Sequence, residues 1–245
     1  AQEIDHRPHI VMAGFIDLHL HGGGDADFMD GTPQALRQVA AAHCAHGTTA
    51  MTPTTLTCPD EELEQFIAVY HRVVKEGTGS AQFLGIHLEG PYFSHASRGA
   101  QPVTAPRHPA LGEVERLLRL GKGQILRWDA APELPGVKEF AALLKSRGIL
   151  VSVAHTNGVA SYIEAAFTWG FSHMTHFYNA MTTYRKMEGR MYAGAVEAAY
   201  LNDDVSLELI GDGRHIPRES MLLALKIKGP QGIALITDAM RAAGR

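Results

Sequence analysis

The sequence predicts an α/β protein built as a (β/α)8 barrel, and three observations lead to that prediction. Apolar runs of strand length alternate with amphipathic stretches of helical length, which is the pattern of βα units around a parallel sheet. Eight such runs occur in 245 residues, a length at which α/β barrels often form one domain. Polar residues that can bind metal or transfer protons stand at the carboxyl ends of these runs, where barrels of this kind place their active sites.

The expected elements follow in chain order. The eight strands are Gly14–His21, Thr48–Pro53, Phe83–Glu89, Ile125–Ala130, Ile149–His155, Ser172–His176, Ser206–Ile210 and Ile233–Thr237. The helical segments between them are Pro33–His46, Pro59–Val74, Gly136–Ser146, Val159–Trp169 and Pro217–Lys226. The second of these carries acidic residues in its first turn, where the helix dipole favours negative charge. We expect the eighth helix to be missing or very short.

Composition narrows the class of protein. A hydrophobic content of 45% and a charged content of 20% are ordinary for a soluble globular domain. The net charge of −4, without a long charge run, gives no indication of a nucleic-acid or membrane partner. Two cysteines, Cys44 and Cys58, form no disulfide framework, which fits a reducing, cytoplasmic location. No signal peptide or membrane-spanning run is visible.

The ends of the sequence lead to an expectation about its extent. The chain begins with Ala1, and its last strand lies close to Arg245. We therefore expect a fragment or a processed product, in which residues 1–245 form one barrel core.

Residues at the strand ends predict a metal site. His19 and His21 are two apart, so both imidazoles face the same side of a strand, and neutral imidazole is the commonest metal ligand in proteins. Taken alone, such a pair is more often two polar residues at a strand mouth than half of a metal site. Further residues of the same chemistry end other strands: Glu89, His155, His176 and Asp238. Four histidines and two carboxylates from five strands predict a divalent metal with an acid/base group beside it.

Other polar residues have structural interpretations. His173 has the opposite strand parity to His176 and is expected to face the helices. His87 lies one layer below Glu89 in the barrel, which favours a buried, hydrogen-bonded role. Asp17 is expected to face inward as a buried polar tie. The histidines expected to be solvated are His6, His9, His43, His46, His71, His95 and His108.

Six motifs, in this order along the chain, resemble those of N-acetylglucosamine-6-phosphate deacetylases in the amidohydrolase superfamily. They are Gly14-Phe15-Ile16-Asp17-Leu18-His19-Leu20-His21-Gly22, His87-Leu88-Glu89-Gly90-Pro91, Val153-Ala154-His155-Thr156, Thr175-His176-Phe177-Tyr178-Asn179-Ala180-Met181, Asp212-Gly213-Arg214-His215 and Thr237-Asp238-Ala239-Met240. The resemblance implies a TIM-like barrel of the metal-dependent amidohydrolase type. Family members also have a small β-sandwich built from both chain ends, whose segments we expect to be absent here.

The resemblance also implies a reaction and a ligand set. The reaction is hydrolysis of the N-acetyl group of N-acetylglucosamine 6-phosphate, giving glucosamine 6-phosphate and acetate, with Asp238 as acid and base. Glu89, His155 and His176 would hold the principal metal, and His19 and His21 would complete a second site that shares Glu89. We expect one or two Zn²⁺ per chain, with Fe²⁺, Mn²⁺ or Co²⁺ as alternatives. The run Ile125–Ala130 contains no lysine, so the carbamylated lysine of other amidohydrolases is not expected.

For the substrate, the resemblance places Asn179 and Ala180 at the phosphate and His215 at the sugar or phosphate. Gln101 stands twelve residues after Glu89, where many family members carry a histidine that helps polarise the carbonyl.

The segment Thr182–Arg190 departs from the family pattern that supplies a phosphate-binding arginine across a dimer interface. Arg185 or Arg190 is expected to substitute for it in a homodimer. Tyr92 and Phe93 line a sugar pocket or pack under a loop.

Three hypotheses remain open. The first is an amino-sugar-phosphate deacetylase that binds a small molecule and neither nucleic acid nor membrane. The second is a deacetylase of another N-acetyl sugar, such as the galactosamine epimer, or of another N-acyl compound. The third is a non-catalytic barrel fragment that serves as an assembly or binding partner.

Overall fold

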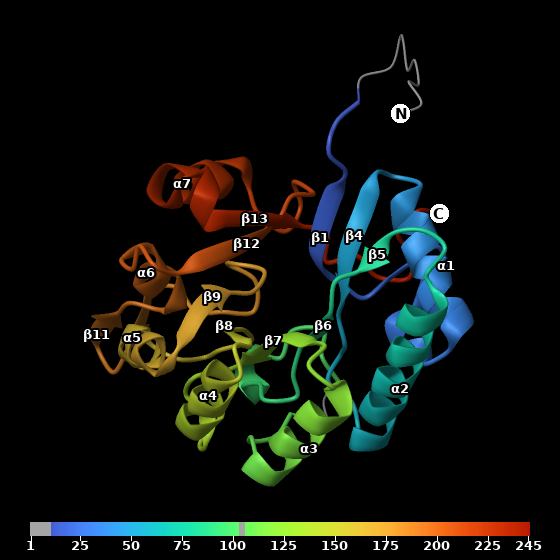
Figure 1. The fold of residues 1–245 in the computed structure, drawn as a ribbon. Helices are drawn as coiled ribbons and strands as arrows, with labels where there is room; N and C mark the ends of the chain where they lie inside the picture. Colours follow the sequence, from blue (N-terminus) through green and yellow to red (C-terminus); the bar gives the residue numbers. More distant parts are fainter. Residues whose placement is uncertain (1–10, 103–105) are drawn as a thin grey trace.

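A parallel eight-position barrel forms the centre of the molecule, as the sequence predicts (Figure 1). The computed structural model describes residues 11–102 and 106–245, so His6 and His9 lie outside the described residues. One sheet contains β1 (Phe15–Leu20), β4 (Thr48–Pro53) and β5 (Gln82–Phe83). The other has the order β13 (Ile233–Ile236), β12 (Ser206–Ile210), β9 (Phe171–Met174), β8 (Leu150–Val153), β7 (Ile125–Ala130) and β6 (Ile86–Leu88).

The two sheets join at both edges to close the ring. Single parallel bridges connect Leu20 with Ala239 and Thr54 with His87. The Asp238 backbone N–H also donates to the His19 carbonyl at 2.9 Å. Because both junctions lie at the carboxyl ends of the strands, they fix the end at which the site residues gather.

The expected strand Phe83–Glu89 is divided into β5 and β6. The break falls at Leu84-Gly85, where β7 approaches closely. A Cβ on Gly85 would lie 2.3 Å from Cγ of Leu126, so a glycine is required there. The division separates the sheet that contains β1 from the sheet that contains β7.

In the described part of the chain, seven α-helices lie between the strands. They are α1 (Pro33–Cys44), α2 (Asp60–Glu76), α3 (Leu111–Gly121), α4 (Val137–Ser146), α5 (Ala160–Trp169), α6 (Ala195–Tyr200) and α7 (Arg218–Lys228). The five predicted helices are confirmed, with ends that differ by a few residues. Two helices were not predicted from the sequence. Helix α3 buries Val114 and Leu117 about one turn apart, and α6 has only six residues.

The first two helices show why these segments are helical. The Thr32 hydroxyl accepts a hydrogen bond from the Ala35 N–H at 3.2 Å and caps α1, with Pro33 in its first turn. Helix α2 buries one stripe of side chains, made up of Leu63, Phe66, Ile67, Tyr70 and Val73, and this spacing places them on a single face.

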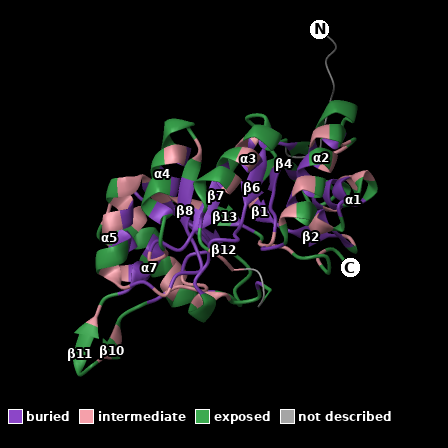
Figure 2. Ribbon diagram, turned by 90° about the horizontal axis from the view of Figure 1, so that it is seen from below, coloured by how far each residue is buried: buried purple, intermediate pink, exposed green. Residues whose placement is uncertain are grey.

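Short strands extend from the barrel at two places. Strands β2 (Gly22–Gly23) and β3 (Ala26–Asp27) pair after β1, and 3-10 turns cover Phe28–Asp30, His95–Ser97 and Pro230–Gly232. Strands β10 (Arg185–Met187) and β11 (Arg190–Tyr192) form an antiparallel hairpin that projects from the body of the molecule (Figure 2). The departing segment Thr182–Arg190 therefore includes most of a protruding hairpin.

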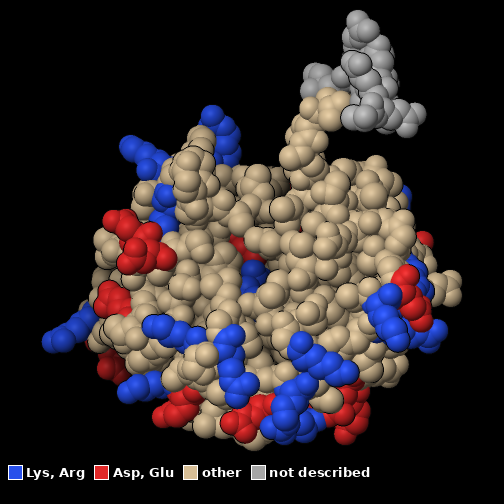
Figure 3. All heavy atoms as spheres, viewed as in Figure 1, with Lys and Arg blue, Asp and Glu red and all other residues tan. Residues whose placement is uncertain are grey.

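The outer surface differs around the ring. No helix follows β13 among residues 11–102 and 106–245, and the side chains of Phe15, Ile16 and Leu235 on β1 and β13 are exposed. On the face shown in Figure 3, acidic and basic residues are intermixed around the rim rather than gathered by sign. None of the helices in the described ranges combines the length and apolar character needed to cross a membrane.

Candidate metal and acid–base site

Strand β1 brings the first two histidines to the carboxyl end of the barrel. His19 lies on the strand and His21 follows it, and both are buried. Their Nε2 atoms are 3.3 Å apart. The alternation of side chains along a strand thus places both imidazoles on one face, as the spacing predicts.

Glu89 lies at the centre of the cluster, directly after β6. Its Oε1 is 3.0 Å from Nε2 of His155 and 3.1 Å from Nε2 of His176. Its Oε2 is 3.3 Å from Nε2 of His21, and its Oε1 is 3.9 Å from Nε2 of His19. One carboxylate therefore faces both pairs of histidines.

The other pair and the second carboxylate lie where the chain leaves a strand. His155, His176 and Asp238 all have left-handed backbones, with φ of 47°, 32° and 49°. Such residues cost about 1–3 kcal/mol each and are concentrated at functional sites. The turn directs each side chain back over the mouth of the barrel.

Asp238 borders the cluster from the last strand. Its Oδ1 is 3.3 Å from Nε2 of His21 and 3.5 Å from Nε2 of His19. Unlike the buried Glu89, its side chain is 21% exposed. It can therefore reach both the histidines and the open space above them.

The donor set fits a divalent metal ion. Two groups of buried ligand atoms, each lying within 4.8 Å of one another, share one carboxylate: His19, His21 and Glu89, and Glu89, His155 and His176. Imidazole nitrogens with carboxylate oxygens suit Zn²⁺ and neighbouring transition metals. The five predicted ligands are thus brought together, although their role as ligands remains a prediction.

Electrostatics at the cluster favour charged forms despite burial. Burial opposes the charged imidazole of His21, but hydrogen bonds with Asp238 and Glu89 outweigh it and raise its pKa to about 10. Burial also opposes the charge on His176, and Glu89 raises its pKa to about 9. Against the same penalty, the surrounding histidines hold the pKa values of Glu89 and Asp238 below their usual range. A divalent cation and these protons compete for the same lone pairs.

A cavity of about 970 Å³ opens above the cluster. Its lining includes all four predicted substrate residues: Gln101, Asn179, Ala180 and His215. Asn179 Nδ2 donates to the carbonyls of His176 and Phe177. His215 is exposed, and its Nδ1 lies 2.8 Å from Oδ2 of Asp212, whose pKa is lowered to about 2 by the backbone N–H groups of His215 and Arg214.

Gln101 is held more firmly than a simple substrate contact requires. Its Nε2 donates to Oε2 of Glu89 at 2.7 Å, and its Oε1 accepts from the Thr57 N–H at 2.9 Å. The side chain is buried. It therefore orients Glu89 while keeping one amide hydrogen available to the cavity.

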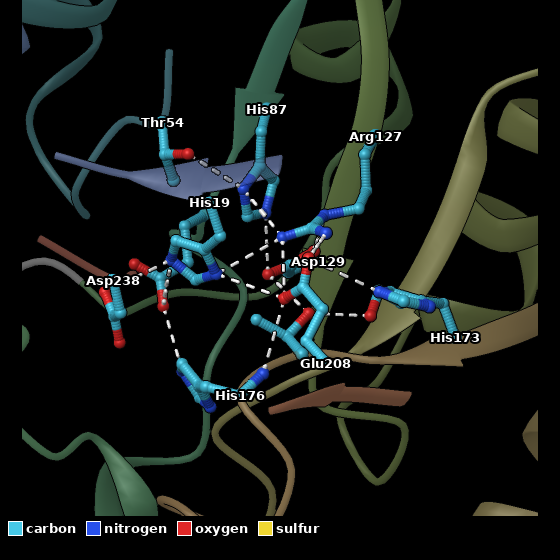
Figure 4. A network of polar contacts seen from close by, with 12 residues as sticks. His19, Thr54, His87, Arg127, Asp129, His173, His176, Glu208 and Asp238 are labelled. Carbon is cyan, nitrogen blue, oxygen red and sulfur yellow. Dashed lines mark hydrogen bonds and ion pairs between the residues drawn. The ribbon is translucent and has the colours of Figure 1, made fainter. Parts of the chain in front are cut away.

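Below the cluster lies a buried polar network that the sequence analysis recognised only in part (Figure 4). His87 is fully buried between Thr54, Arg127 and Asp129, as predicted. Burial and the nearby Arg127 guanidinium lower its pKa to about 3. Arg127, Asp129 and Glu208 were missed, although they are the charged residues of two otherwise largely apolar strands, β7 and β12.

Asp17 is the predicted polar tie. It accepts hydrogen bonds from the hydroxyl of Thr237 at 2.5 Å and from the Thr237 N–H at 3.3 Å. Tyr92 and Phe93 are buried, so packing is the correct one of their two interpretations.

Two predicted histidine orientations are wrong. His173 faces the barrel interior rather than the helices, with Nδ1 2.7 Å from the Ser206 hydroxyl and Nε2 3.5 Å from Glu208. The parity argument fails because β9 ends at Met174, before His176. His43 is buried rather than solvated, because β2 folds over α1 and places the Gly22 carbonyl 3.0 Å from its Nε2.

The two arginines expected at the phosphate do not line the cavity. Arg185 donates to the side-chain and backbone oxygens of Asn157 at 2.7 and 2.8 Å. Arg190 lies on β11 and is exposed. Within one chain, neither arginine of the hairpin therefore lines the cavity.

Comparisons with known proteins agree on one family. The model of the amidohydrolase family matches residues 10–231. The N-acetylglucosamine-6-phosphate deacetylase of Bacillus subtilis (strain 168) is 35% identical over 96% of this chain and 59% of its own length. The N-acetylgalactosamine-6-phosphate deacetylase of Escherichia coli O157:H7 is 32% identical over 96% of this chain and 61% of its own.

A solved structure gives the same result. A point mutant of N-acetyl-D-glucosamine-6-phosphate deacetylase from Mycobacterium smegmatis, in complex with N-acetyl-D-glucosamine-6-phosphate, superposes with a TM-score of 0.86 at 33% identity. The match covers 94% of this chain and 58% of that one. The chain thus spans about three fifths of the length of these relatives.

Proposed function

The chain belongs to the amidohydrolase family, and from that premise we propose that it removes the acetyl group of an N-acetylhexosamine 6-phosphate by hydrolysis. The preferred substrate is N-acetylglucosamine 6-phosphate, and the products are glucosamine 6-phosphate and acetate. Relatives that carry the names of such deacetylases support the substrate class.

The main support for the proposal is the position of the candidate ligands and Asp238 at one cavity. Four of the five candidate ligands, His21, Glu89, His155 and His176, line one cavity together with Asp238, at the carboxyl end of the barrel. This is the end at which barrel enzymes bind substrates. The Asp238 carboxylate is partly exposed to this cavity, which a cluster with a purely structural role would not require.

We assign the metal to Glu89 with His155 and His176, and a second metal to Glu89 with His19 and His21. When bound, a divalent metal, with Zn²⁺ preferred, polarises the amide carbonyl and makes a coordinated water more acidic. Gln101 keeps Oε2 of Glu89 in place through its 2.7 Å hydrogen bond.

Asp238 moves the proton. An Oδ oxygen accepts a proton from the attacking water and returns it to the nitrogen of the departing amine. Its low pKa means that the carboxylate is ready as a base at neutral pH, and its contacts with His19 and His21 hold it in position.

The remaining cavity residues orient the sugar. Asn179 and Ala180 contact the phosphate, and His215 contacts the sugar or phosphate. Because Arg185 and Arg190 lie on the projecting hairpin, we propose that one of them reaches the phosphate of a neighbouring subunit in a homodimer. The small, charged substrate fits a cytoplasmic enzyme of amino-sugar catabolism.

The alternative substrate is the galactosamine epimer. The relative from Escherichia coli O157:H7 carries that name at 32% identity, and the segment Thr182–Arg190 departs from the family pattern. The two epimers differ only in the configuration of the 4-hydroxyl.

A panel assay tests the proposal. Zinc-loaded protein is incubated with N-acetylglucosamine 6-phosphate, N-acetylgalactosamine 6-phosphate and the two free sugars, and released acetate is measured. We expect the highest kcat/KM for the first substrate. A higher value for its epimer would favour the alternative, and equal values for phosphorylated and free sugars would remove the phosphate from the proposal. Absence of acetate from every substrate would favour a non-catalytic barrel.

A further inference from the structure

Glu208 and Arg127 form an ion pair inside the barrel, in a layer directly below the candidate ligands. Glu208 lies on β12 and Arg127 on β7, and both are buried. Nη1 of Arg127 donates to Oε1 of Glu208, and Nη2 lies 3.3 Å from Oε2. The reaction as proposed above uses neither residue, although burying two charges has a large desolvation cost.

Among the candidate ligands, only His19 contacts the Arg127–Glu208 pair through its imidazole ring. Oε2 of Glu208 is 3.2 Å from Nδ1 of His19, on the opposite side of the ring from the nitrogen that faces Glu89 and Asp238. Nη2 of Arg127 is 3.3 Å from the same Nδ1. The neutral His19 ring can therefore carry its hydrogen on Nδ1, where it faces Oε2 of Glu208, or on Nε2, which leaves the Nδ1 lone pair facing Nη2 of Arg127.

Counting donors and acceptors decides between the arrangements. Arginine has donors only, and an ionised carboxylate has acceptors only. The two hydrogens of Nη2 have acceptors in Nδ1 of His87, at 2.8 Å, and in Oε2 of Glu208. If Nδ1 of His19 carried no hydrogen, its lone pair would face the lone pairs of Oε2 at 3.2 Å, which is repulsive. A hydrogen on Nδ1 converts that contact into a charge-assisted hydrogen bond.

The other candidate ligands have no carboxylate in this position. Nδ1 of His155 lies 3.0 Å from the Ser97 carbonyl. Within the described residues, Nδ1 of His21 and Nδ1 of His176 have no hydrogen-bond partner. A carboxylate behind a ligating histidine fixes the tautomer and raises the basicity of the ligating nitrogen.

We propose that the Arg127–Glu208 pair is a positioning device that fixes His19 in the Nδ1–H tautomer and so sets the affinity of the His19, His21 and Glu89 group for its metal. Arg127 orients Glu208, Glu208 accepts from Nδ1–H, and the Nε2 lone pair of His19 stays directed at the ligand cluster. The inference rests on the proposed function, because it assumes the same metal centre. It goes beyond that function by giving each of the two ligand groups its own metal affinity.

The main test measures two metal affinities in one protein. Zn²⁺ is titrated into chelator-treated wild type and Glu208→Gln against a competing chromophoric chelator, and elemental analysis gives the stoichiometry. Glu208→Gln keeps the size of the side chain but removes the charge that orders Arg127 and His19. We expect the weaker zinc equivalent to lose about 10–100-fold in affinity, as is typical when an outer carboxylate is removed, and the tighter equivalent to stay unchanged.

Ser206→Ala is the matched control. Ser206 lies two residues before Glu208 on the same strand, and its hydroxyl contacts His173 rather than His19. A purely structural role for Glu208 would lower the melting temperature without changing the ratio of the two affinities. An unchanged ratio in Glu208→Gln, equal weakening of both equivalents, or a wild-type stoichiometry of one zinc would overturn the proposal.

A second measurement needs no variant. Two-bond ¹H–¹⁵N correlation spectra of the zinc-loaded wild type identify which ring nitrogen of His19 carries hydrogen. Hydrogen on Nδ1 is the expected result, and hydrogen on Nε2 would overturn the inference even if Glu208→Gln does not fold. Neither measurement depends on substrate, so a protein that binds two zinc ions but releases no acetate would refute the proposed function and leave this inference standing.

Discussion

The two histidine pairs that face Glu89 reach it by different structural routes. His155 and His176 follow their strands at left-handed residues, so local backbone turns direct them. His19 lies on β1 and His21 directly follows it, and Nδ1 of His19 faces Oε2 of Glu208. The first pair thus depends on neighbouring backbone, and the second on an ion pair between β7 and β12. This difference indicates that the two halves of the site can be disabled separately.

The largest expected effect follows from breaking the locally built half. His155→Ala or His176→Ala removes one of three ligands of the principal group, and we expect loss of most bound metal and nearly all deacetylase activity. Elemental analysis and the acetate assay measure both. His71→Ala is the histidine control, because His71 lies on α2 outside the site and contacts the Leu120 carbonyl of α3, so metal content and activity should stay at wild-type values. Full metal content with normal turnover in either site variant would refute the assignment.

The second prediction concerns Asp238, which borders both halves. Asp238→Asn keeps the shape of the side chain but cannot accept the proton, and loss of a positioned acid/base group typically lowers the rate by about 10²–10⁴. Because Asp238 stands outside both ligand groups, metal content should remain unchanged. Activity within a few-fold of wild type would transfer the role to another residue.

The third prediction breaks the other half. The double variant His19→Ala/His21→Ala leaves Glu89, His155 and His176 in place, so metal stoichiometry should fall towards one rather than to zero. Elemental analysis of the purified variant measures this directly. Loss of both equivalents together would show that the two halves of the site are not separable.

The fourth prediction uses one titrating histidine from each half. In the folded protein the pKa of His21 is raised to about 10 and that of His176 to about 9, against about 6.5 in an unfolded chain. Their stabilising contribution is therefore complete below about pH 6.5 and is lost as the pH rises through about 9–10. Thermal unfolding of chelator-treated protein should show a falling Tm across that range. Zinc-loaded protein is the control and should change less, and a flat profile without metal would contradict the shifts.

The smallest expected effect lies outside both halves, in the hairpin. Arg190→Ala or Arg185→Ala should raise KM for N-acetylglucosamine 6-phosphate by about tenfold, because a guanidinium donates two parallel hydrogen bonds to phosphate. KM for the free sugar should stay the same. Lys138→Ala, an exposed cation on α4, serves as the control. Equal changes for both sugars would exclude phosphate binding by the hairpin.

The two halves also differ in how far the sequence could predict them. All five ligand candidates could be located, because each follows an apolar run and parallel strands end at one edge of the barrel. The support behind His19 could not, since Arg127 and Glu208 are 81 residues apart and nothing local relates them. The alternation of side chains predicted the face of each residue correctly along β1. It failed for His173, because β9 ends at Met174 and the parity counted back from His176 does not apply. The burial of His43 depends on β2 folding over α1, a contact that helical periodicity does not encode.

The closure between β1 and β13 has a consequence for the order of folding. Asp17 and Thr237 are 220 residues apart, so their bond can form only after the segment that reaches Thr237 has been synthesised. Contacts of such long range are entropically slow to form. Glu89, His155 and His176 leave the ribosome well before Asp238, so the proposed principal ligand group is available to a nascent chain before the proposed acid–base carboxylate. The chain would then acquire the capacity to capture metal before the capacity for turnover.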